Sequence, residues 1–466
     1  MFNEDFLADV IKEALNNGGD FADVFVEYSE VNSISCEEDK IEQVLSGLDA
    51  GAGLRIIRGE EVLYGSTNDL SQEGLLTLAK ELSATRAPQK KPKAPVFTRD
   101  ESLIFVSKSM LPVLRSPATV AIRQKIDLVN SANSVARKFD SRITQVSVDY
   151  ADKIKNIEIM NSFGLYKQER RVYTVFTVHT VAEKKGLMQT GYKLIGGLEG
   201  FELFDEYNVN DVAAKSADIA VRMLSAKKAP TGRMPVILAS EAGGTMIHEA
   251  IGHSLEADLV QKGISQYSGK LGEKVASELI TVIDDATLPK KRGSFAIDDE
   301  GTPAQRTVLV EKGVLQNYLY DQYTARKDKR VSTGNGRRES YRFKPIPRMS
   351  NTYIASGKQK PDDIISSIDT GLYVKKMGGG QVNTTNGDFV FEVSEGYEVK
   401  KGKIGSLVRG ATLIGNGPNI LKLIDMVGND LDFDMGTCGK DGQHVPVGDG
   451  QPTVRIKEIT VGGTGS

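Results

Sequence analysis

Two histidines that flank a glutamate form the cluster with the clearest chemical potential in this sequence. The segment 245–253 reads TMIHEAIGH, follows an apolar run and a glycine-containing turn, and holds two of the chain's 4 histidines. Zinc binds neutral imidazole nitrogen or thiolate sulfur, and a catalytic zinc site keeps one position open for water. The segment therefore predicts a catalytic zinc site in which His248 and His253 are ligands and Glu249 is the general base.

The spacing of this cluster is His-Glu-x-x-x-His, one residue longer than the common zinc-peptidase pattern. On a regular α-helix, residues i and i+4 differ by about 40° around the axis, whereas residues i and i+5 differ by about 140°. Side chains that point so far apart could not hold one ion. We therefore expect the helix to widen into an i→i+5 turn or to break near His253, with Gly252 at the point where a distortion costs least.

Two histidines are too few for a zinc site, so a third ligand must come from another part of the chain. Cys438 lies in the glycine-rich segment 434–442, and its thiolate would complete a His₂Cys site, a known catalytic ligand set. A buried, inert cysteine is the alternative for this residue. Glu256 and Asp258 compete as oxygen ligands, and His444 is a weaker competitor.

Other polar groups have less specific interpretations. His179 lies in a predicted strand among mostly apolar residues, which favours a structural role. The acidic segment 298–302 could orient the two histidines, although a surface turn is the simpler interpretation. Three arginines could hold a substrate carboxylate, namely Arg337, Arg338 and Arg342.

The rest of the chain must position these groups. The spacing of apolar residues in its first half, 1–228, predicts an α+β domain with an antiparallel sheet. A Pro/Lys-rich stretch at 87–95 is a possible sub-boundary within this half. The predicted helices cover 6–15, 72–83, 117–139 and 212–224, and the predicted strands cover 24–28, 54–58 and 61–64, with more between 143 and 194.

Glycine is concentrated in the second half of the chain, 229–466. Short runs typical of strands, such as 389–393 and 397–399, alternate there with glycine-containing turns. This half is predicted to be a Gly-rich, β-rich C-terminal domain that binds the metal. The expected fold class of the whole chain is therefore α+β.

The bulk properties exclude several classes of protein. The 466 residues carry a net charge of −3, so no overall basic field favours a nucleic-acid partner. No cationic start precedes an apolar run, and no stretch approaches the roughly 18 consecutive apolar residues of a membrane span. The 2 cysteines lie almost a chain length apart, which fits a reducing compartment. We expect a cytoplasmic protein that contacts neither membrane nor nucleic acid.

Several short motifs follow one another along the second half of the chain. They are MIHEAIGH at 246–253, GDF at 387–389, EGY at 395–397, KIG at 403–405, GATLIGNG at 410–417, GTCGK at 436–440 and GQ at 442–443 before VP at 445–446. In these motifs the sequence resembles the TldD/PmbA family of modulator-of-gyrase peptidases, and in particular its TldD-like members.

The resemblance implies a metallopeptidase whose zinc is bound by His248, His253 and Cys438. Some relatives lack these residues and resemble non-catalytic companions that pair with a metal-bearing member. Because this chain keeps every metal position, the resemblance implies a catalytic member that forms a homodimer or a heterodimer with a companion chain of the same family.

The expected reaction is zinc-dependent hydrolysis of peptide bonds, with Glu249 moving the proton of the attacking water. Glycine-punctuated strands between 378 and 417 could bind an extended backbone, which predicts short or unfolded polypeptides as substrates. These glycines could instead only build tight turns. Two other functions remain open, a zinc amidohydrolase that acts on small molecules and a non-catalytic subunit with a structural zinc.

Overall fold

A computed structural model describes residues 2–85, 104–106, 113–383 and 385–463. Its first half is built on a long antiparallel sheet with the order β3-β2-β1-β5-β6-β4, and β7 also pairs with β6. The strands are β1 Phe21–Glu37, β2 Lys40–Arg58, β3 Glu61–Thr67, β4 Ile104–Val106, β5 Ile143–Asn161, β6 Tyr166–Lys184 and β7 Leu187–Gly197. Only the β4–β6 pair is parallel, so the predicted antiparallel sheet is confirmed.

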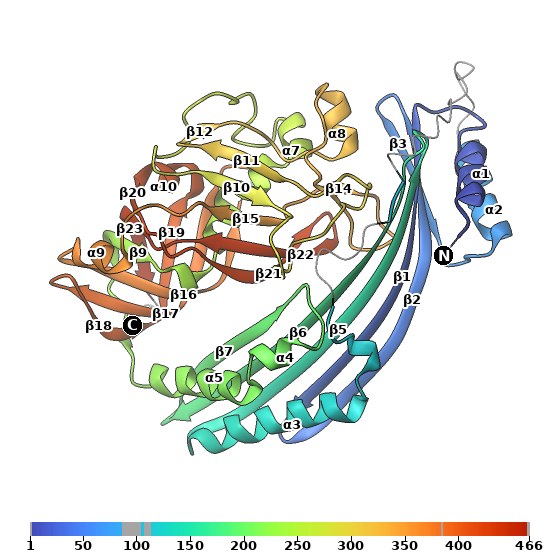
Figure 1. Ribbon diagram of the computed structural model, residues 1–466. Helices are drawn as coiled ribbons and strands as arrows, with labels where there is room; N and C mark the ends of the chain where they lie inside the picture. Colours follow the sequence, from blue (N-terminus) through green and yellow to red (C-terminus); the bar gives the residue numbers. More distant parts are fainter. Residues whose placement is uncertain (1, 86–103, 107–112, 384, 464–466) are drawn as a thin grey trace.

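Helices cover the two ends of this sheet (Figure 1). α1 and α2 pack together at one end, and α3 and α5 cover the other end, where α5 follows the short helix α4. Their bounds are α1 Glu4–Ala14, α2 Gln72–Ala84, α3 Ile122–Phe139, α4 Leu203–Glu206 and α5 Val209–Met223. The side chains of Asn3 and Ser71 cap the first turns of α1 and α2 by accepting backbone hydrogen bonds.

The predicted helices of the first half are present, with shifts at their ends. The helix expected from 117 begins only at Ile122, because Pro117–Thr119 form a separate 3₁₀ turn. The expected turn at 59–60 joins β2 to β3. β2 is much longer than the predicted run 54–58. The prediction missed its first half, from Lys40, because those residues are exposed and lack an alternating apolar pattern.

A closed ring of five strands forms the core of the second half. β16 pairs with β9, β9 with β23, β23 with β19, β19 with β17, and β17 again with β16. β18, β20 and β8 extend this sheet. The strands are β8 Lys227–Lys228, β9 Gly232–Leu238, β16 Thr370–Val382, β17 Asp388–Lys400, β18 Lys403–Arg409, β19 Ala411–Asn416, β20 Ile424–Val427 and β23 Val454–Gly463. The two runs expected at 389–393 and 397–399 are thus one strand.

A second sheet packs beside the ring in the order β12-β11-β10-β15-β22-β21, so β21 is its last strand. These strands are β10 Val282–Asp285, β11 Arg306–Glu311, β12 Val314–Leu315, β15 Asn351–Ile354, β21 Asp432–Lys440 and β22 Gln443–Gln451, and a small pair is made by β13 Gly336–Arg337 and β14 Ile346–Pro347. The short helices are α6 Thr245–Ile247, α7 Ala257–Gln261, α8 Gln322–Lys327, α9 Pro361–Ser366 and α10 Gly417–Leu423. The α+β fold class with a β-rich second half is confirmed.

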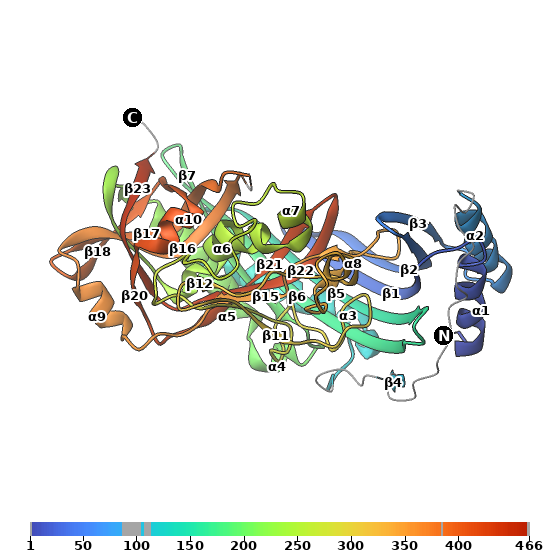
Figure 2. The same cartoon turned by 90° about the horizontal axis from the view of Figure 1, so that it is seen from above.

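The long sheet curves around the C-terminal body, which lies against its concave face (Figure 1). From above, the molecule is elongated, with α1 and α2 at one end and α9 with β18 at the other (Figure 2). Buried ion pairs join the two parts, with Arg55 2.7 Å from Glu300 and Arg171 2.8 Å from Asp299. The acidic segment 298–302 is therefore neither a surface turn nor a partner of the histidines, because Asp299 and Glu300 face arginines of the long sheet and Asp298 accepts hydrogen bonds from backbone N–H groups.

Of the two domain boundaries proposed from the sequence, only the one near residue 228 lies within the described residues. The possible sub-boundary at 87–95 lies outside the described residues. Near the expected boundary at 228, β8 pairs with β18 of the C-terminal sheet, so the chain enters the second half at this strand. Among the described residues, no helix is both long and apolar enough to cross a membrane.

Candidate metal centre

The two motif histidines lie on a short, widened turn of helix. α6 continues into a single π-helical turn, His248–Gly252, and then into a 3₁₀ turn that begins at His253. The backbone N–H of His253 donates to the carbonyl of His248, which is an i→i+5 hydrogen bond. The expected widening of the helix is therefore confirmed. It brings the two imidazole rings to 5.0 Å between centroids, with their planes almost perpendicular.

Glycines let other elements pack closely against this turn. Gly252 has ordinary right-handed helical angles, but a Cβ at this position would lie 2.1 Å from the Sδ atom of Met349. Gly417, the first residue of α10, would place a Cβ 2.5 Å from the carbonyl oxygen of Ala250. Gly252 is thus required by packing and not by backbone freedom, which differs from the reason expected from the sequence.

Cys438 on β21 is the third group that reaches the histidines. The ligand atoms of His248, His253 and Cys438 all lie within 4.8 Å of one another, and all three residues are buried. The Cys438 Sγ atom lies 3.5 Å from the His253 Nε2 atom. In a tetrahedral zinc site, bonds of about 2.0 and 2.3 Å separate a nitrogen and a sulfur ligand by about 3.5 Å. The donor set and its spacing therefore fit zinc.

Two carboxylates orient the imidazole rings. The Asp449 Oδ1 atom on β22 lies 2.7 Å from the His248 Nδ1 atom, and the Glu256 Oε2 atom lies 3.1 Å from the His253 Nδ1 atom. Each Nδ1 is thus engaged, which leaves Nε2 as the free ligand atom of each ring. Glu256, expected as a competing ligand, instead contacts the imidazole of His253, a candidate ligand. Lys440 lies 3.0 Å from the same Glu256 oxygen.

The charges around the thiol favour its ionised form. Burial opposes ionisation of Cys438, but hydrogen bonds and charges from His248 and His253 outweigh burial and lower its pKa to about 5. Burial also opposes ionisation of Glu256, whose pKa is lowered to about 2 by Lys440 and His253. At neutral pH the site therefore holds a thiolate, and because the same contacts raise the pKa of His253 to about 10, a metal that binds here would displace a proton from an imidazole.

Glu249 lies half-buried on the π turn between the two histidines. Among the described residues, no hydrogen bond or ion pair engages its carboxylate. A general base needs a carboxylate that is free to accept a proton, so this environment is compatible with that role.

The remaining candidates lie elsewhere or have other partners. Asp258 pairs with Lys440 at 2.7 Å. His444 is opposite Gly439 on the β21–β22 hairpin, and its side chain is 66% exposed and 3.5 Å from Glu339. His179 lies on β6 of the long sheet.

The three candidate arginines differ in their partners. Arg342 pairs with Asp49 at 2.6 Å, and Arg338 lies 3.3 Å from Asp23. Carboxylates of the long sheet therefore neutralise both of these residues. Arg337 instead donates to backbone carbonyls and pairs with no carboxylate among the described residues.

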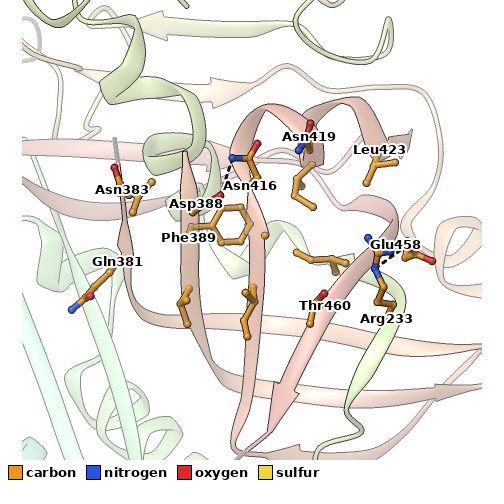
Figure 3. Close-up of a pocket in the computed structure, with 16 residues that line it drawn as sticks. Arg233, Gln381, Asn383, Asp388, Phe389, Asn416, Asn419, Leu423, Glu458 and Thr460 are labelled. Atoms are coloured by element: carbon orange, nitrogen blue, oxygen red, sulfur yellow. Dashed lines mark hydrogen bonds and ion pairs between the residues drawn. The ribbon is translucent and has the colours of Figure 1, made fainter. Parts of the chain in front are cut away.

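A cavity of about 680 Å³ lies on the strands of the ring and is separate from this site (Figure 3). None of the three candidate ligands is among the residues that line it. Its charged side chains bond to neighbours, since Arg233 lies 3.2 Å from Glu458 and Asn416 donates to Asp388 at 3.0 Å. This cavity, despite its volume, is therefore not part of the candidate metal centre.

The chain resembles one known family along most of its length. It matches the PmbA/TldA metallopeptidase domain 1 over residues 22–85, the central domain over 115–224 and the C-terminal domain over 231–463. The metalloprotease TldD homolog of Buchnera aphidicola subsp. Acyrthosiphon pisum is 38% identical over 463 residues, covering 96% of this chain and 93% of the relative. The zinc metalloprotease TldD homolog of Saccharolobus solfataricus is 26% identical over 459 residues, covering 97% and 99%.

Solved structures share the fold. A Thermotoga maritima protein described as a modulator of a DNA gyrase superposes with a TM-score of 0.80 at 22% identity, covering 98% of this chain and 100% of that chain. TldE from Thermococcus kodakarensis superposes with a TM-score of 0.77 at 18% identity, with the same coverage. From the matched domains and the identity to its relatives, and as its motifs predicted, the chain belongs to the PmbA/TldD family of metallopeptidases.

Proposed function

We propose that this chain is a zinc peptidase that hydrolyses peptide bonds in short or unfolded polypeptides. The zinc would be held by His248, His253 and Cys438, and Glu249 would be the general base. The observation that carries the proposal is the convergence of two imidazoles and a cysteine within 4.8 Å, on elements almost 200 positions apart. The name of the Saccharolobus solfataricus relative, a zinc metalloprotease, supports zinc as the metal.

A zinc ion at this site supplies two effects, a lower pKa for a water and polarisation of the scissile carbonyl. The residues of the chain perform the remaining tasks. Asp449 and Glu256 accept hydrogen bonds from the two histidines and fix the tautomer that presents Nε2. Glu249 accepts a proton from the attacking water and returns it to the leaving nitrogen.

A peptide substrate needs a strand edge whose backbone groups are unpaired, and its own backbone must be free to pair with that edge. Within the ring, β16 pairs with β9 only over Leu372–Val374, so its glycine-containing end, 378–382, is paired with β17 alone and has one unpaired side. β21 offers a second edge, because it is the last strand of its sheet, and it carries Cys438. An extended peptide that adds to the edge of β21 would place its backbone beside the metal ligands. A folded protein keeps its backbone paired internally and is excluded until it opens locally.

We also propose a cytoplasmic homodimer, or a heterodimer with a companion chain of the same fold. The fold shared with TldE from Thermococcus kodakarensis supports a companion of this kind. Light scattering at working concentration, combined with the peptide assay, tests this part of the proposal. A monomer that is fully active without a partner would contradict it.

The test of the function combines metal analysis with hydrolysis. Elemental analysis should find about one zinc per chain, and a panel of unrelated short peptides should be cleaved before chelation, spared after it and cleaved again when zinc is restored. One polypeptide in native and destabilised forms tests the substrate form, because only the destabilised form should be cut. Hydrolysis of small amides but not peptides would favour an amidohydrolase. Bound zinc without any hydrolysis would favour a non-catalytic subunit.

A further inference from the structure

A second cavity lies between the long sheet and the β21–β22 hairpin. Its volume is about 250 Å³, and it is lined by residues of β5, of β6 and of the hairpin, among them Lys155, Tyr173 and Thr437. Basic side chains outnumber acidic ones in its lining, where only Asp152, Asp299 and Glu339 carry negative charge. The basic side chains are Lys153, Lys155, Arg171, Arg292, Arg337 and Arg338.

Four of these six cations have carboxylate partners. Lys155 and Lys153 lie 3.4 and 3.5 Å from the oxygens of Glu27. Arg171 lies 2.8 Å from both Glu169 and Asp299, and the ion pair of Arg338 is described above. The charge of these side chains is therefore compensated within the protein.

Arg337 and Arg292 form no ion pair of this kind, although the charge of Asp299 acts on Arg337, whose guanidinium lies 5.2 Å from the centre of the Phe295 ring. Arg337 is 2% exposed and donates only to the backbone carbonyls of Met349 and Pro446, and its Nε atom is buried without an acceptor. Arg292 reaches the Thr437 hydroxyl at 3.4 Å, and its Nε atom is likewise buried without an acceptor. Neither guanidinium forms an ion pair with any described residue. Burial lowers the pKa of both, and for Arg337 it outweighs the opposing charge of Asp299.

We propose that this cavity is a binding site for a small oxyanion, held by Arg292 and Arg337. A buried cation without a partner is costly, so an anion that enters the cavity removes an existing penalty. Guanidinium groups present a planar fork that matches carboxylate and phosphate oxygens. The volume of about 250 Å³ is sufficient for phosphate or a small dicarboxylate.

The position of the site is separate from the metal centre. Thr437 lines the cavity, and its neighbour Cys438 faces the histidines, because successive side chains of a strand point to opposite faces. The oxyanion would therefore bind on the far side of the hairpin that carries the cysteine. This inference stands on the cavity and its two arginines and does not rest on the proposed peptidase activity.

The experiment measures anion binding to the full chain by isothermal titration calorimetry in a phosphate-free buffer. Inorganic phosphate and succinate are titrated separately, with succinamide as the neutral control. We expect saturable binding of phosphate, succinate or both, and none of succinamide. Arg292→Gln should weaken this binding by about tenfold to a hundredfold, because it removes a charged hydrogen-bond donor. Arg292→Lys should give an intermediate loss, since it keeps the charge without the fork.

The matched control is Arg342→Gln, which removes an arginine at the same domain junction but outside the cavity. This variant should bind the anions as the unaltered protein does. Circular dichroism confirms that each variant is folded before titration. Binding of phosphate alone or of succinate alone supports the site and identifies the class of oxyanion. Absence of binding of both anions at about 10 mM, a concentration that detects even millimolar affinity, would overturn the proposal. Undiminished binding by folded Arg292→Gln would do the same.

Discussion

Removal of the carboxylate of Asp449 is the sharpest test of how the site is supported. The side chain of Asp449 is only 11% exposed, and its Oδ1 atom lies 2.7 Å from His248 Nδ1. Loss of such a partner costs about 10- to 100-fold in metal affinity, or about 1.4 to 2.7 kcal/mol. An amide oxygen can still accept the hydrogen bond, so Asp449→Asn should lose mainly the charge and weaken zinc binding about tenfold. Asp449→Ala should approach a hundredfold.

The assay is competition for zinc against a chromogenic chelator at fixed pH, with circular dichroism to verify folding. Asp425→Asn is the matched control, because Asp425 is a similarly protected carboxylate that pairs with Arg455 at 2.7 Å on another strand. This control should bind zinc as the unaltered protein does. If folded Asp449→Asn and Asp449→Ala both bound zinc within twofold of the unaltered protein, Asp449 would have no part in holding the metal.

Three further predictions concern the ligands, the base and the domain junction. Cys438→Ser should lose most bound zinc, because two histidines make a poor site; undiminished zinc by elemental analysis would exclude Cys438 as a ligand. Glu249→Gln should keep its zinc and lose about 10²- to 10⁴-fold in kcat, and an unchanged kcat in the zinc-loaded variant would exclude Glu249 as the base. Burial raises the pKa of both Asp298 and Glu300, and Arg55 opposes this shift at Glu300. These two groups then keep more protons in the folded state than in the unfolded chain, so their contribution to stability should fall as pH rises from about 4 towards neutral, and Glu300→Gln should flatten the slope in urea unfolding. A slope equal to that of the unaltered protein would contradict this.

Periodic apolar residues made most of the first half predictable from the sequence, because each helix buries one face against the long sheet. α1 shows this, with Leu7, Val10, Ile11 and Ala14 buried at helical spacing. The first half of β2 was missed because its residues are exposed and show no alternation. The acidic segment 298–302 was placed on the surface for a related reason. The arginines that compensate it, Arg55 and Arg171, are more than 100 positions away and leave no local pattern.

Some features of the candidate site could be predicted from local spacing in the sequence, and others depend on residues that are far apart in the chain. The spacing of His248 and His253 was enough to predict a widened turn, because helix geometry alone decides where their side chains point. Glu256 was noticed since it follows His253 by three residues, but its contact with the imidazole depends on the break in the helix. Asp449 was not predicted, because 201 positions separate it from His248 and no spacing rule connects them.

The candidate metal centre would assemble only in the folded C-terminal half. The π turn can place two imidazoles by itself, but both Cys438 and Asp449 come from the β21–β22 hairpin. The hairpin is held against the turn by a backbone hydrogen bond from Gly244 to the carbonyl of Asp449, and a Cβ at Gly244 would lie 2.4 Å from the backbone of Gly450. Zinc at this site would therefore bind the native state much better than the unfolded chain, and its binding free energy would add to the stability of the domain. Chelation should accordingly lower the melting temperature as well as abolish hydrolysis.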